Sequence, residues 1–294
     1  MPDYRRPAAL LVPHYRSTIL AVLEAIAVFA ARVIGVVLLS SDREFTQAFV
    51  AAQPHPKRFR IVTAPFDSPW VRDRSPVAIR ERTGYRWAMT RLNPMNRPLD
   101  DVLFPRISRP RLDHVPIVLA HGNIVAGPRG VALTTSRVLT DNPEADMATL
   151  TAAVARLGIR RWIIVRSFAG EMTGHTDVYA RFLRPGLLAV AWSETLAADR
   201  DVATEVHARV IDALPGIKVV RLPMRSDGCH YASPLNWVQL GRTLLVPRYA
   251  LTPPDDTQRI ARSLRAAGFT SEFITSPTEA FGGSLHCLTA SLYV

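Results

Sequence analysis

Runs typical of β-strands alternate with runs typical of helices along the whole chain, and this rhythm limits the folds that it can adopt. Helix candidates recur at intervals of roughly 50–60 residues, and strand candidates outnumber them about two to one. Such a spacing predicts repeated units, each with one helix and a few strands, in an α/β fold. No stretch of identical sequence repeats with this rhythm, so the pseudo-symmetry is inferred from the order of elements alone.

The predicted elements rest on short apolar or β-branched runs for strands and on longer runs for helices. Strands are predicted at Ala8–Leu11, Val33–Leu39, Arg60–Thr63, Ile117–Ala120, Val131–Thr135, Arg161–Val165, Leu187–Ala191, Lys218–Leu222, Thr243–Val246 and Glu272–Ile274. Helices are predicted at Ser17–Ala31, Arg43–Ala52, Glu144–Leu157, Ala198–Leu214 and Asp255–Ala267. The last helix has the clearest start, because two prolines lead into two aspartates that suit a positive helix N-terminus.

The composition along the chain favours a single domain. Hydrophobic residues make up 48% of the 294 residues, which is enough for a sizeable core. No stretch has the composition of an interdomain linker, so residues 1–294 are expected to form a single domain. The segment Arg91–Pro110 is rich in Pro, Asn and Arg without a clear period, and it is expected to be a long loop. Loops of this length in compact proteins often act as lids.

The number of cysteines and the nature of the apolar segments indicate the cellular compartment of the protein. The two cysteines, Cys229 and Cys287, are too few for a disulfide-built fold or for a structural zinc site. The start of the chain lacks the cleavage pattern of a signal peptide. The apolar stretch Thr18–Leu39 is interrupted by Glu24 and Arg32, so it is interpreted as a helix followed by a strand. A cytoplasmic protein without a membrane span is therefore expected.

The net charge of +11 comes almost entirely from arginine. A nucleic-acid-binding protein usually concentrates its charge on one strip, interleaved with aromatic residues. Here the arginines are spread along the chain without a dense block, which favours a solvated basic surface over nucleic-acid binding. A homo-oligomer is left open.

Three short segments concentrate chemically active side chains. They are Trp70-Val-Arg72-Asp73, Gly174-His175-Thr-Asp177 and Gly282-Gly283-Ser-Leu-His286-Cys287. Two carboxylates can each grip a planar guanidinium through paired hydrogen bonds, which fixes its central carbon. A cysteine can attack that carbon, while a histidine protonates the leaving amine and later activates water. The paired glycines allow a ligand to approach the backbone closely.

His175 and Asp177 are two positions apart. In a strand their side chains would project to the same face, whereas in a helix they would diverge. The Val178-Tyr179 pair that follows favours a strand. The sequence thus predicts a strand that points His175 and Asp177 at one ligand.

These residues resemble the agmatine deiminase and bacterial peptidylarginine deiminase family, within the wider guanidine-modifying superfamily. The resemblance covers most of the chain in family order. Its motifs are Trp70-x-Arg72-Asp73-x-x-Pro76, Gly122-Asn123 with Leu133-Thr134-Thr135, Gly174-His175-x-Asp177-x-x-Ala180-Arg181-Phe182, Leu235-Asn236-Trp237 with Val246-Pro247, and Gly282-Gly283-x-x-His286-Cys287-x-Thr289.

The resemblance implies a five-bladed α/β propeller, the pentein fold, and a deiminase that acts on a small guanidine. It implies that Cys287 is the nucleophile of an S-alkylthiouronium intermediate, that His175 is the general acid and base, and that Asp73 and Asp177 bind the guanidinium. Other residues would shape or support the pocket: Trp70, Arg72, Asn236, Gly282 and Gly283. No metal or organic cofactor is implied.

The sequence departs from the family pattern at two places. Where the family has Glu-Gly-Gly-Asn, this chain reads Ala120-His121-Gly122-Asn123. The missing glutamate belongs to the acidic surroundings of the catalytic histidine, and Glu171 is the candidate replacement. The family's Trp-Gly-Gly-Lys stretch is replaced by the segment that begins at Arg91, which argues against agmatine as the substrate.

Alternatives stay open at this point. An amidinotransferase would use the same four residues, with an amine in place of water. A non-catalytic guanidine-binding protein would explain Ala120. Taken singly, Asp73 fits a surface ion-pair cluster and His175 a structural histidine. His121, His286 and Cys229 are expected to be structural or incidental.

Overall fold

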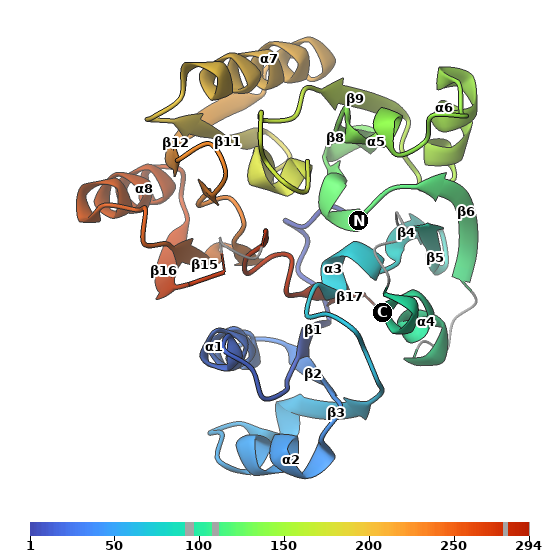
Figure 1. Cartoon of the computed structure of the whole chain (residues 1–294), viewed down its shortest axis with the longest axis vertical. Coiled ribbons are helices and arrows are strands. Elements are labelled where there is room, and N and C mark those ends of the chain that lie inside the picture. Colours follow the sequence, from blue (N-terminus) through green and yellow to red (C-terminus); the bar gives the residue numbers. More distant parts are fainter. Residues whose placement is uncertain (92–96, 108–111, 279–281, 294) are drawn as a thin grey trace.

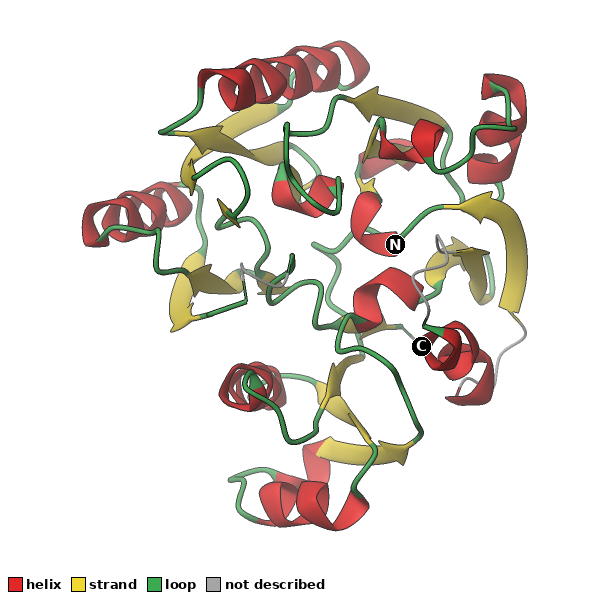
Figure 2. Cartoon of the chain, viewed as in Figure 1, coloured by secondary structure: helices red, strands yellow, loops and turns green. Residues whose placement is uncertain are grey.

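The strands form a ring of small sheets around a central axis. The computed structural model describes residues 1–91, 97–107, 112–278 and 282–293. Within these ranges there are five sheets, each of three or four strands (Figure 1). The helices lie mostly on the rim, and loops gather toward the middle of the ring (Figure 2). We call each sheet with its crossover helix a blade.

Every blade repeats one unit. Each unit contains two antiparallel strands, and a crossover helix leads from the second of them to a third strand that runs parallel to it; in blade 1 the first of these strands comes from the C-terminal end of the chain. This is the unit of one helix and a few strands that the spacing of elements predicts, so the expected pseudo-symmetry is confirmed. Parallel pairing requires a long connection, which explains why a helix recurs in each unit.

The strand bounds follow the order of the blades. Blade 1 contains β17 (Ala290–Leu292), β1 (Ala9–Pro13), β2 (Gly35–Ser40) and β3 (Phe59–Thr63). Blade 2 contains β4 (Val77–Glu81), β5 (Gly84–Arg91) and β6 (Leu112–Val118). Blade 3 contains β7 (Val125–Ala126), β8 (Val131–Thr135) and β9 (Arg161–Val165). Blade 4 contains β10 (Ala180–Arg184), β11 (Leu187–Ser193), β12 (Lys218–Ser226) and β13 (Tyr231–Ala232), and blade 5 contains β14 (Val238–Leu240), β15 (Thr243–Arg248) and β16 (Thr270–Thr275).

Helices connect the strands within and between blades. The α-helices are α1 (Leu20–Ala31), α2 (Arg43–Ala51), α3 (Val71–Arg74), α4 (Pro98–Ile107), α5 (Arg137–Thr140), α6 (Met147–Ala155), α7 (Ala197–Ala213) and α8 (Pro254–Ala266). The 3-10 turns are η1 (Pro56–Arg58), η2 (His121–Asn123), η3 (Pro128–Gly130) and η4 (Thr176–Val178). Of the helices that the structure describes, none combines the length and the apolar character that crossing a bilayer requires.

Local sequence explains most of these elements. Several inner strands have the near-continuous apolar runs that are typical of buried parallel strands. In β2, Val36 to Leu39 are all buried. Asp42 caps α2 by accepting the backbone N–H of Phe45 at 3.0 Å, and Asp146 caps α6 by accepting that of Thr149 at 2.7 Å.

The largest apolar cluster joins blades 3, 4 and 5. Each of these blades contributes a fully buried leucine from its central strand, namely Leu133, Leu188 and Leu244. Burying one leucine side chain contributes about 1.5–3 kcal/mol. Packing between neighbouring blades, rather than within one blade, therefore holds this half of the ring together.

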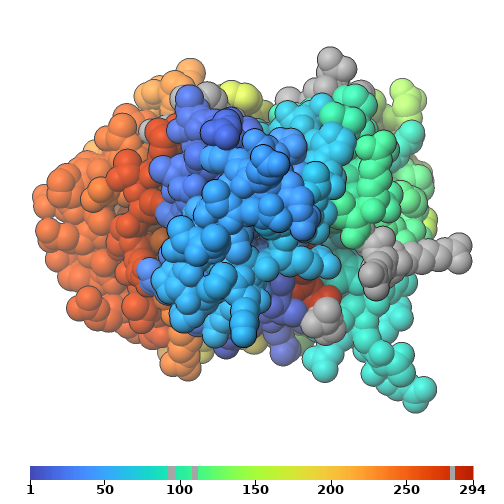
Figure 3. Space-filling model, turned by 90° about the horizontal axis from the view of Figure 1, so that it is seen from below, coloured from blue at the N-terminus to red at the C-terminus, as the bar shows by residue number. Residues whose placement is uncertain are grey.

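The ring closes through the C-terminal segment. Strand β17 pairs antiparallel with β1, with Ala290 opposite Leu11 and Leu292 opposite Ala9. Blade 1 consequently lies between blade 5 and blade 2, as the blue, orange-red and cyan surfaces of Figure 3 show. Because β17 begins three positions after Cys287, closure of the ring also fixes the predicted nucleophile near the axis.

One predicted loop contains a helix. The segment Arg91–Pro110 includes α4, whose first turn carries Asp100 and Asp101 after Pro98. Proline and acidic residues at a helix start stabilise the exposed N–H groups, and this signal outweighs Pro105 inside the helix. The prediction of an irregular loop is wrong for 98–107, while 92–96 and 108–110 lie outside the described residues.

Candidate active site

Asp73 lies on the short helix α3, which is anchored from two sides. Upstream of α3, the carboxylate of Asp100 in α4 accepts the backbone N–H of Asp67 at 2.8 Å and the hydroxyl of Ser68 at 2.6 Å. Within α3, the backbone N–H of Arg72 donates to the carbonyl of Cys287 at 3.2 Å. These contacts place Asp73 beside the nucleophile segment.

His175 and Asp177 lie on a turn rather than on a strand. Gly174 has a φ of +65°, and η4 begins directly after His175. The Asn123 side-chain oxygen accepts the backbone N–H of Thr176 at 3.2 Å and its hydroxyl at 2.7 Å. A left-handed glycine and a side-chain cap both favour a turn, so the predicted strand is wrong. The turn nevertheless brings His175 and Asp177 to the centre of the ring.

Asn123 also ties this turn to blade 3, because its side-chain oxygen accepts the backbone N–H of Thr135 at 2.9 Å. Glu171 holds the turn from the other side. Its carboxylate accepts the backbone N–H groups of Thr173 at 3.0 Å and Gly174 at 2.5 Å. Glu171 therefore supports the backbone that carries His175, which differs from the polarising role considered for it.

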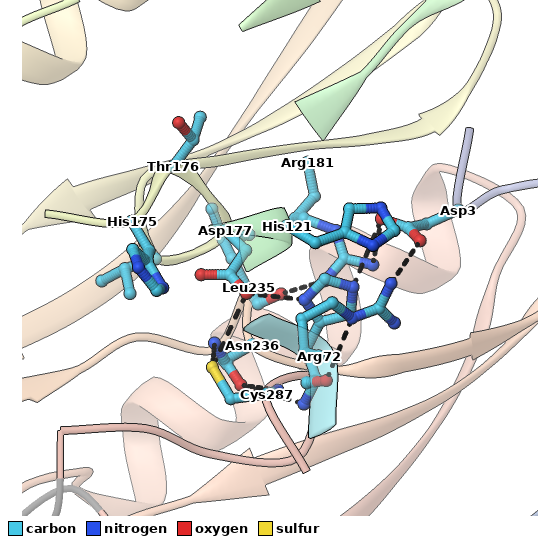
Figure 4. A network of polar contacts seen from close by, with 12 residues as sticks. Asp3, Arg72, His121, His175, Thr176, Asp177, Arg181, Leu235, Asn236 and Cys287 are labelled. Atoms are coloured by element: carbon cyan, nitrogen blue, oxygen red, sulfur yellow. Dashed lines mark hydrogen bonds and ion pairs between the residues drawn. The ribbon is translucent and has the colours of Figure 1, made fainter. Parts of the chain in front are cut away.

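Cys287 is 5% exposed, and the side chains of Asn236 and Asp177 hold it in place. The side-chain amide of Asn236 donates to the thiol sulfur at 3.3 Å, and the thiol donates to Oδ2 of Asp177 at 3.6 Å. The side-chain oxygen of Asn236 also accepts the backbone N–H groups of His286 and Cys287 at 2.9 and 3.4 Å. Asn236 thus fixes both the main chain and the sulfur (Figure 4).

His175 approaches Asp73 at the position of the altered family motif. Nδ1 of His175 lies 3.5 Å from Oδ1 of Asp73. Gly122 lies against both, since a Cβ added there would stand 2.6 Å from Nδ1 of His175 and 3.1 Å from Oδ1 of Asp73. Glycine is therefore required at this position. Asp73 supplies the negative charge next to His175 in a chain that has Ala120 in place of the family glutamate.

His286 makes a contact that the sequence analysis did not assign to it. Its Nδ1 lies 2.6 Å from Oδ2 of Asp177, and the ring is buried. The sequence offered one signal, because His286 directly precedes Cys287 in the motif. That signal did not say which side chain His286 would meet.

Burial and charge set the proton affinities at the site. Burial by itself would raise the pKa of Asp177, but the hydrogen bond and charge of His286, with His175 and Arg181, hold this pKa below its usual range. Burial raises the pKa of Asp73, and the neighbouring Asp177 adds to the rise against the opposing charge of His175. The pKa of the Cys287 thiol lies well above its usual range because of burial and the charges of Asp177 and Asp73.

Several buried polar atoms at this centre have no hydrogen-bond partner within the described part of the chain. They are Oδ1 of Asp73, Oδ1 of Asp177 and Nδ1 of His175. Buried polar atoms are normally satisfied, so a cluster of unsatisfied acceptors next to a thiol points to a ligand that donates hydrogen bonds. A planar cation with several N–H groups suits two such carboxylates.

Of the remaining predicted site residues, Trp70, Gly282, Gly283 and Asn236 lie close to one another, and Arg72 lies apart from them. Trp70 packs on Gly283, where an added Cβ would stand 2.5 Å from the indole ring. Gly282, Gly283 and Asn236 line a hollow of about 30 Å³ together with Cys229 and Tyr231.

Arg72 lies elsewhere. Its buried guanidinium donates to the carbonyl of His286 at 3.4 Å and faces Asp3, so it lies behind the nucleophile segment rather than in the hollow. That Arg72 helps to shape the substrate pocket stays a prediction. Among the described residues, no group of three or more His, Cys, Asp or Glu side chains has an arrangement that could hold a metal ion.

A ring of five α/β blades is the pentein fold, and Cys287, His175, Asp73 and Asp177 lie together within it. The chain belongs to the Porphyromonas-type peptidyl-arginine deiminase family, whose description matches residues 6–292. The propeller that the motifs implied is thereby confirmed.

Similar proteins agree with this assignment. Agmatine deiminase from Pseudomonas fluorescens (strain SBW25) is 28% identical over 157 residues, which cover 46% of this chain and 42% of that protein's length. The agmatine deiminase of C. jejuni has a similar structure, with a TM-score of 0.82 at 18% identity, covering 100% of this chain and 95% of the other. An arginine deiminase structure from Porphyromonas gingivalis, described as putative, gives a TM-score of 0.84 at 20% identity, covering 99% and 97%. A DDAH from Pseudomonas aeruginosa is more distant, with a TM-score of 0.55 at 13% identity, covering 98% and 100%.

Proposed function

We propose that this protein is a cysteine-dependent hydrolase that converts a small guanidino compound into a ureido product and ammonia, with residues 1–294 acting as one domain. The observation that carries the proposal is that Oδ1 of Asp73 and Oδ1 of Asp177, both buried near the thiol of Cys287, lack a hydrogen-bond partner among the described residues. The family match and the substrate-bound agmatine deiminase of C. jejuni, which has a TM-score of 0.84, support it.

The first half of the reaction replaces ammonia by sulfur. The guanidinium lies between Asp73 and Asp177, and its positive charge offsets the two anions that raise the thiol pKa. The Cys287 sulfur then loses its proton to His175 and forms a bond to the central carbon. The carbon–nitrogen bond to the leaving group breaks, and His175 returns the proton so that ammonia departs. An S-alkylthiouronium is left on Cys287.

The second half restores the enzyme. His175 takes a proton from water, whose oxygen bonds to the same carbon. The carbon–sulfur bond breaks, the ureido product forms, and the thiol is regenerated. Each turnover consumes one guanidinium and one water and releases one ammonium ion.

The decisive experiment measures products with defined variants. The pure protein is incubated with agmatine, free arginine and an arginine peptide, each with and without an amine acceptor, and ammonia and ureido products are quantified. We expect ammonia without an acceptor from the wild type and from Cys229→Ser, and none from Cys287→Ala. Mass spectrometry of the trapped Cys287 adduct identifies the transferred fragment.

Other results would overturn the proposal. Product formation only in the presence of an amine would indicate an amidinotransferase. Binding of a guanidine without any turnover, unaffected by Cys287→Ala, would indicate a non-catalytic binding protein.

A further inference from the structure

The segment that precedes β1 runs into the middle of the ring (Figure 1), and Asp3 of this segment lies next to the side chains of Arg72 and Arg181 (Figure 4). Three basic side chains surround its carboxylate. Nη1 of Arg72 lies 3.4 Å from Oδ1, Nη2 of Arg181 lies 3.5 Å from Oδ2, and Nε2 of His286 lies 3.3 Å from Oδ2. The two guanidinium groups are 2% and 1% exposed, so solvent does little to balance their charge.

Each of these basic side chains also holds a part of the candidate active site. The Arg72 guanidinium donates to the carbonyl of His286, next to the nucleophile. The Arg181 guanidinium donates to the carbonyls of Leu235 and Trp237 at 3.3 and 3.4 Å, on either side of Asn236.

The third basic side chain, His286, contacts Asp177 through its other ring nitrogen at 2.6 Å. Its imidazole therefore lies between two carboxylates, with Nδ1 toward Asp177 and Nε2 toward Asp3. Asp3 thus contacts three side chains that in turn contact His286 beside the thiol, the main chain on both sides of Asn236, and Asp177.

We propose that Asp3 is a positioning residue of the guanidine-hydrolysing site, and that it acts through His286 on the orientation of the substrate-binding carboxylate Asp177. The proposal rests on the function proposed above. Asp3 does not touch the reacting atoms in this scheme. It holds the imidazole in the plane that presents Nδ1 to Oδ2 of Asp177, which leaves Oδ1 of Asp177 free to accept from the guanidinium.

Charge explains why a carboxylate is needed at this position. Without Asp3, the buried guanidinium groups of Arg72 and Arg181 would lose the anion that faces both of them, and unpaired buried charge is strongly unfavourable. Burial alone would raise the pKa of Asp3, but His286, Arg181 and Arg72 hold it well below its usual range. Asp3 is therefore ionised at neutral pH.

The chain offers a matched control for Asp3. Asp256 is also buried and also meets two arginines, with Arg225 at 2.6 Å and Arg259 at 3.0 Å. It lies on α8, at the rim of blade 5. Asp256→Asn thus removes an equivalent carboxylate charge away from the axis.

The test is a double-mutant cycle on kcat/KM with whichever guanidine substrate the wild type turns over. We expect Asp3→Asn to lower kcat/KM by at least about tenfold, since misplacing a binding group by a fraction of an ångström has effects of this size. Asp256→Asn should stay within about twofold. In a His286→Gln background the further effect of Asp3→Asn should be clearly smaller than in the wild-type background, because the support of Asp177 through His286 is then already lost.

Two results would overturn the proposal. One is a kcat/KM of Asp3→Asn within twofold of the wild type, and the other is a pair of effects that simply multiply in the double variant. Melting curves show whether each variant folds. If Asp3→Asn has no cooperative transition, Asp3→Glu, which keeps the charge and moves the carboxylate, takes its place in the same cycle. Failure of the proposed function looks different, because the wild type itself would then release no ammonia.

Discussion

Nδ1 of His286 lies 2.6 Å from Oδ2 of Asp177, so the residue that precedes Cys287 in the chain contacts the carboxylate that lies beside the Cys287 thiol in space. The same carboxylate oxygen accepts the thiol of Cys287 at 3.6 Å. One short segment therefore contributes both the predicted nucleophile and a contact to one of the two carboxylates proposed to bind the guanidinium. The other oxygen of Asp177 is left without a partner among the described residues and is available to a ligand.

The charge of Asp177 should control the reactivity of the resting thiol. Because this anion raises the pKa of Cys287, Asp177→Asn should lower that pKa and increase the thiolate fraction at neutral pH. Alkylation by iodoacetamide at pH 7 should accelerate about tenfold for each pKa unit. The rate is measured by peptide mass spectrometry across pH 6–10 in a Cys229→Ser background. A rate at pH 7 equal to or below that of the unsubstituted Asp177 protein would contradict this prediction.

Gly122 should be intolerant of any side chain. Gly122→Ala would place a Cβ 2.6 Å from Nδ1 of His175, so the imidazole must move away from Asp73. We expect kcat/KM for ammonia release to fall by about a hundredfold. Gly186→Ala is the matched control, because no heavy atom lies within 4 Å of the added Cβ and the residue is exposed. Equal activities of the two variants would show that the close approach at Gly122 is not needed.

Glu171 offers a test of its role in supporting the backbone. Glu171→Gln keeps one acceptor oxygen and loses the other, so either Thr173 or Gly174 gives up a backbone contact near His175. We expect kcat/KM to fall by about tenfold, with the pH dependence of the reaction unchanged. The pH–rate profile is the deciding measurement. A shift of an apparent pKa in that profile would instead favour direct polarisation of His175 by this carboxylate.

Asp199, in the first turn of α7, should make stability depend on pH. Burial raises its pKa from the ordinary value of 3.8 to about 6, and its Oδ2 has no partner among the described residues. A raised folded-state pKa means that ionisation opposes folding, so this residue favours the folded state more below pH 4 than above pH 6. The contribution of Asp199 to the free energy of unfolding is larger below pH 4 than above pH 6 by on the order of 3 kcal/mol.

Neutralising this side chain should therefore stabilise the protein only at higher pH. Asp199→Asn is expected to have a higher Tm than the wild type at pH 8, and the gap should narrow toward pH 4. Melting curves from pH 4 to pH 8 give the comparison. A gap that stays constant with pH would exclude the ionisation of Asp199 as its cause.

The sequence predicted much of the local structure, because strands and helices depend on short-range patterns. The bounds of β8 and β9 agree with the prediction residue for residue, and α8 begins at Pro254, one position before the two aspartates identified as its start signal. Strands β4 and β5 were not predicted, since polar residues and Gly84 interrupt their apolar runs. Helix α4 was missed for a related reason, because Pro105 hides its period.

The sequence by itself determined which residue types stand in the motifs, and it led to the prediction that Asp73, His175, Asp177 and Cys287 serve one kind of chemistry. Only the tertiary structure decided how they meet. Closure of the ring by β17 against β1 brings Cys287 to Asp177 from 110 positions away, and the turn held by Asn123 replaces the predicted strand. The contacts of Asp3 with His286 and of His286 with Asp177 likewise depend on the tertiary structure. Contacts between segments so far apart depend on how the five blades pack around the axis, and no local pattern in the chain encodes that arrangement.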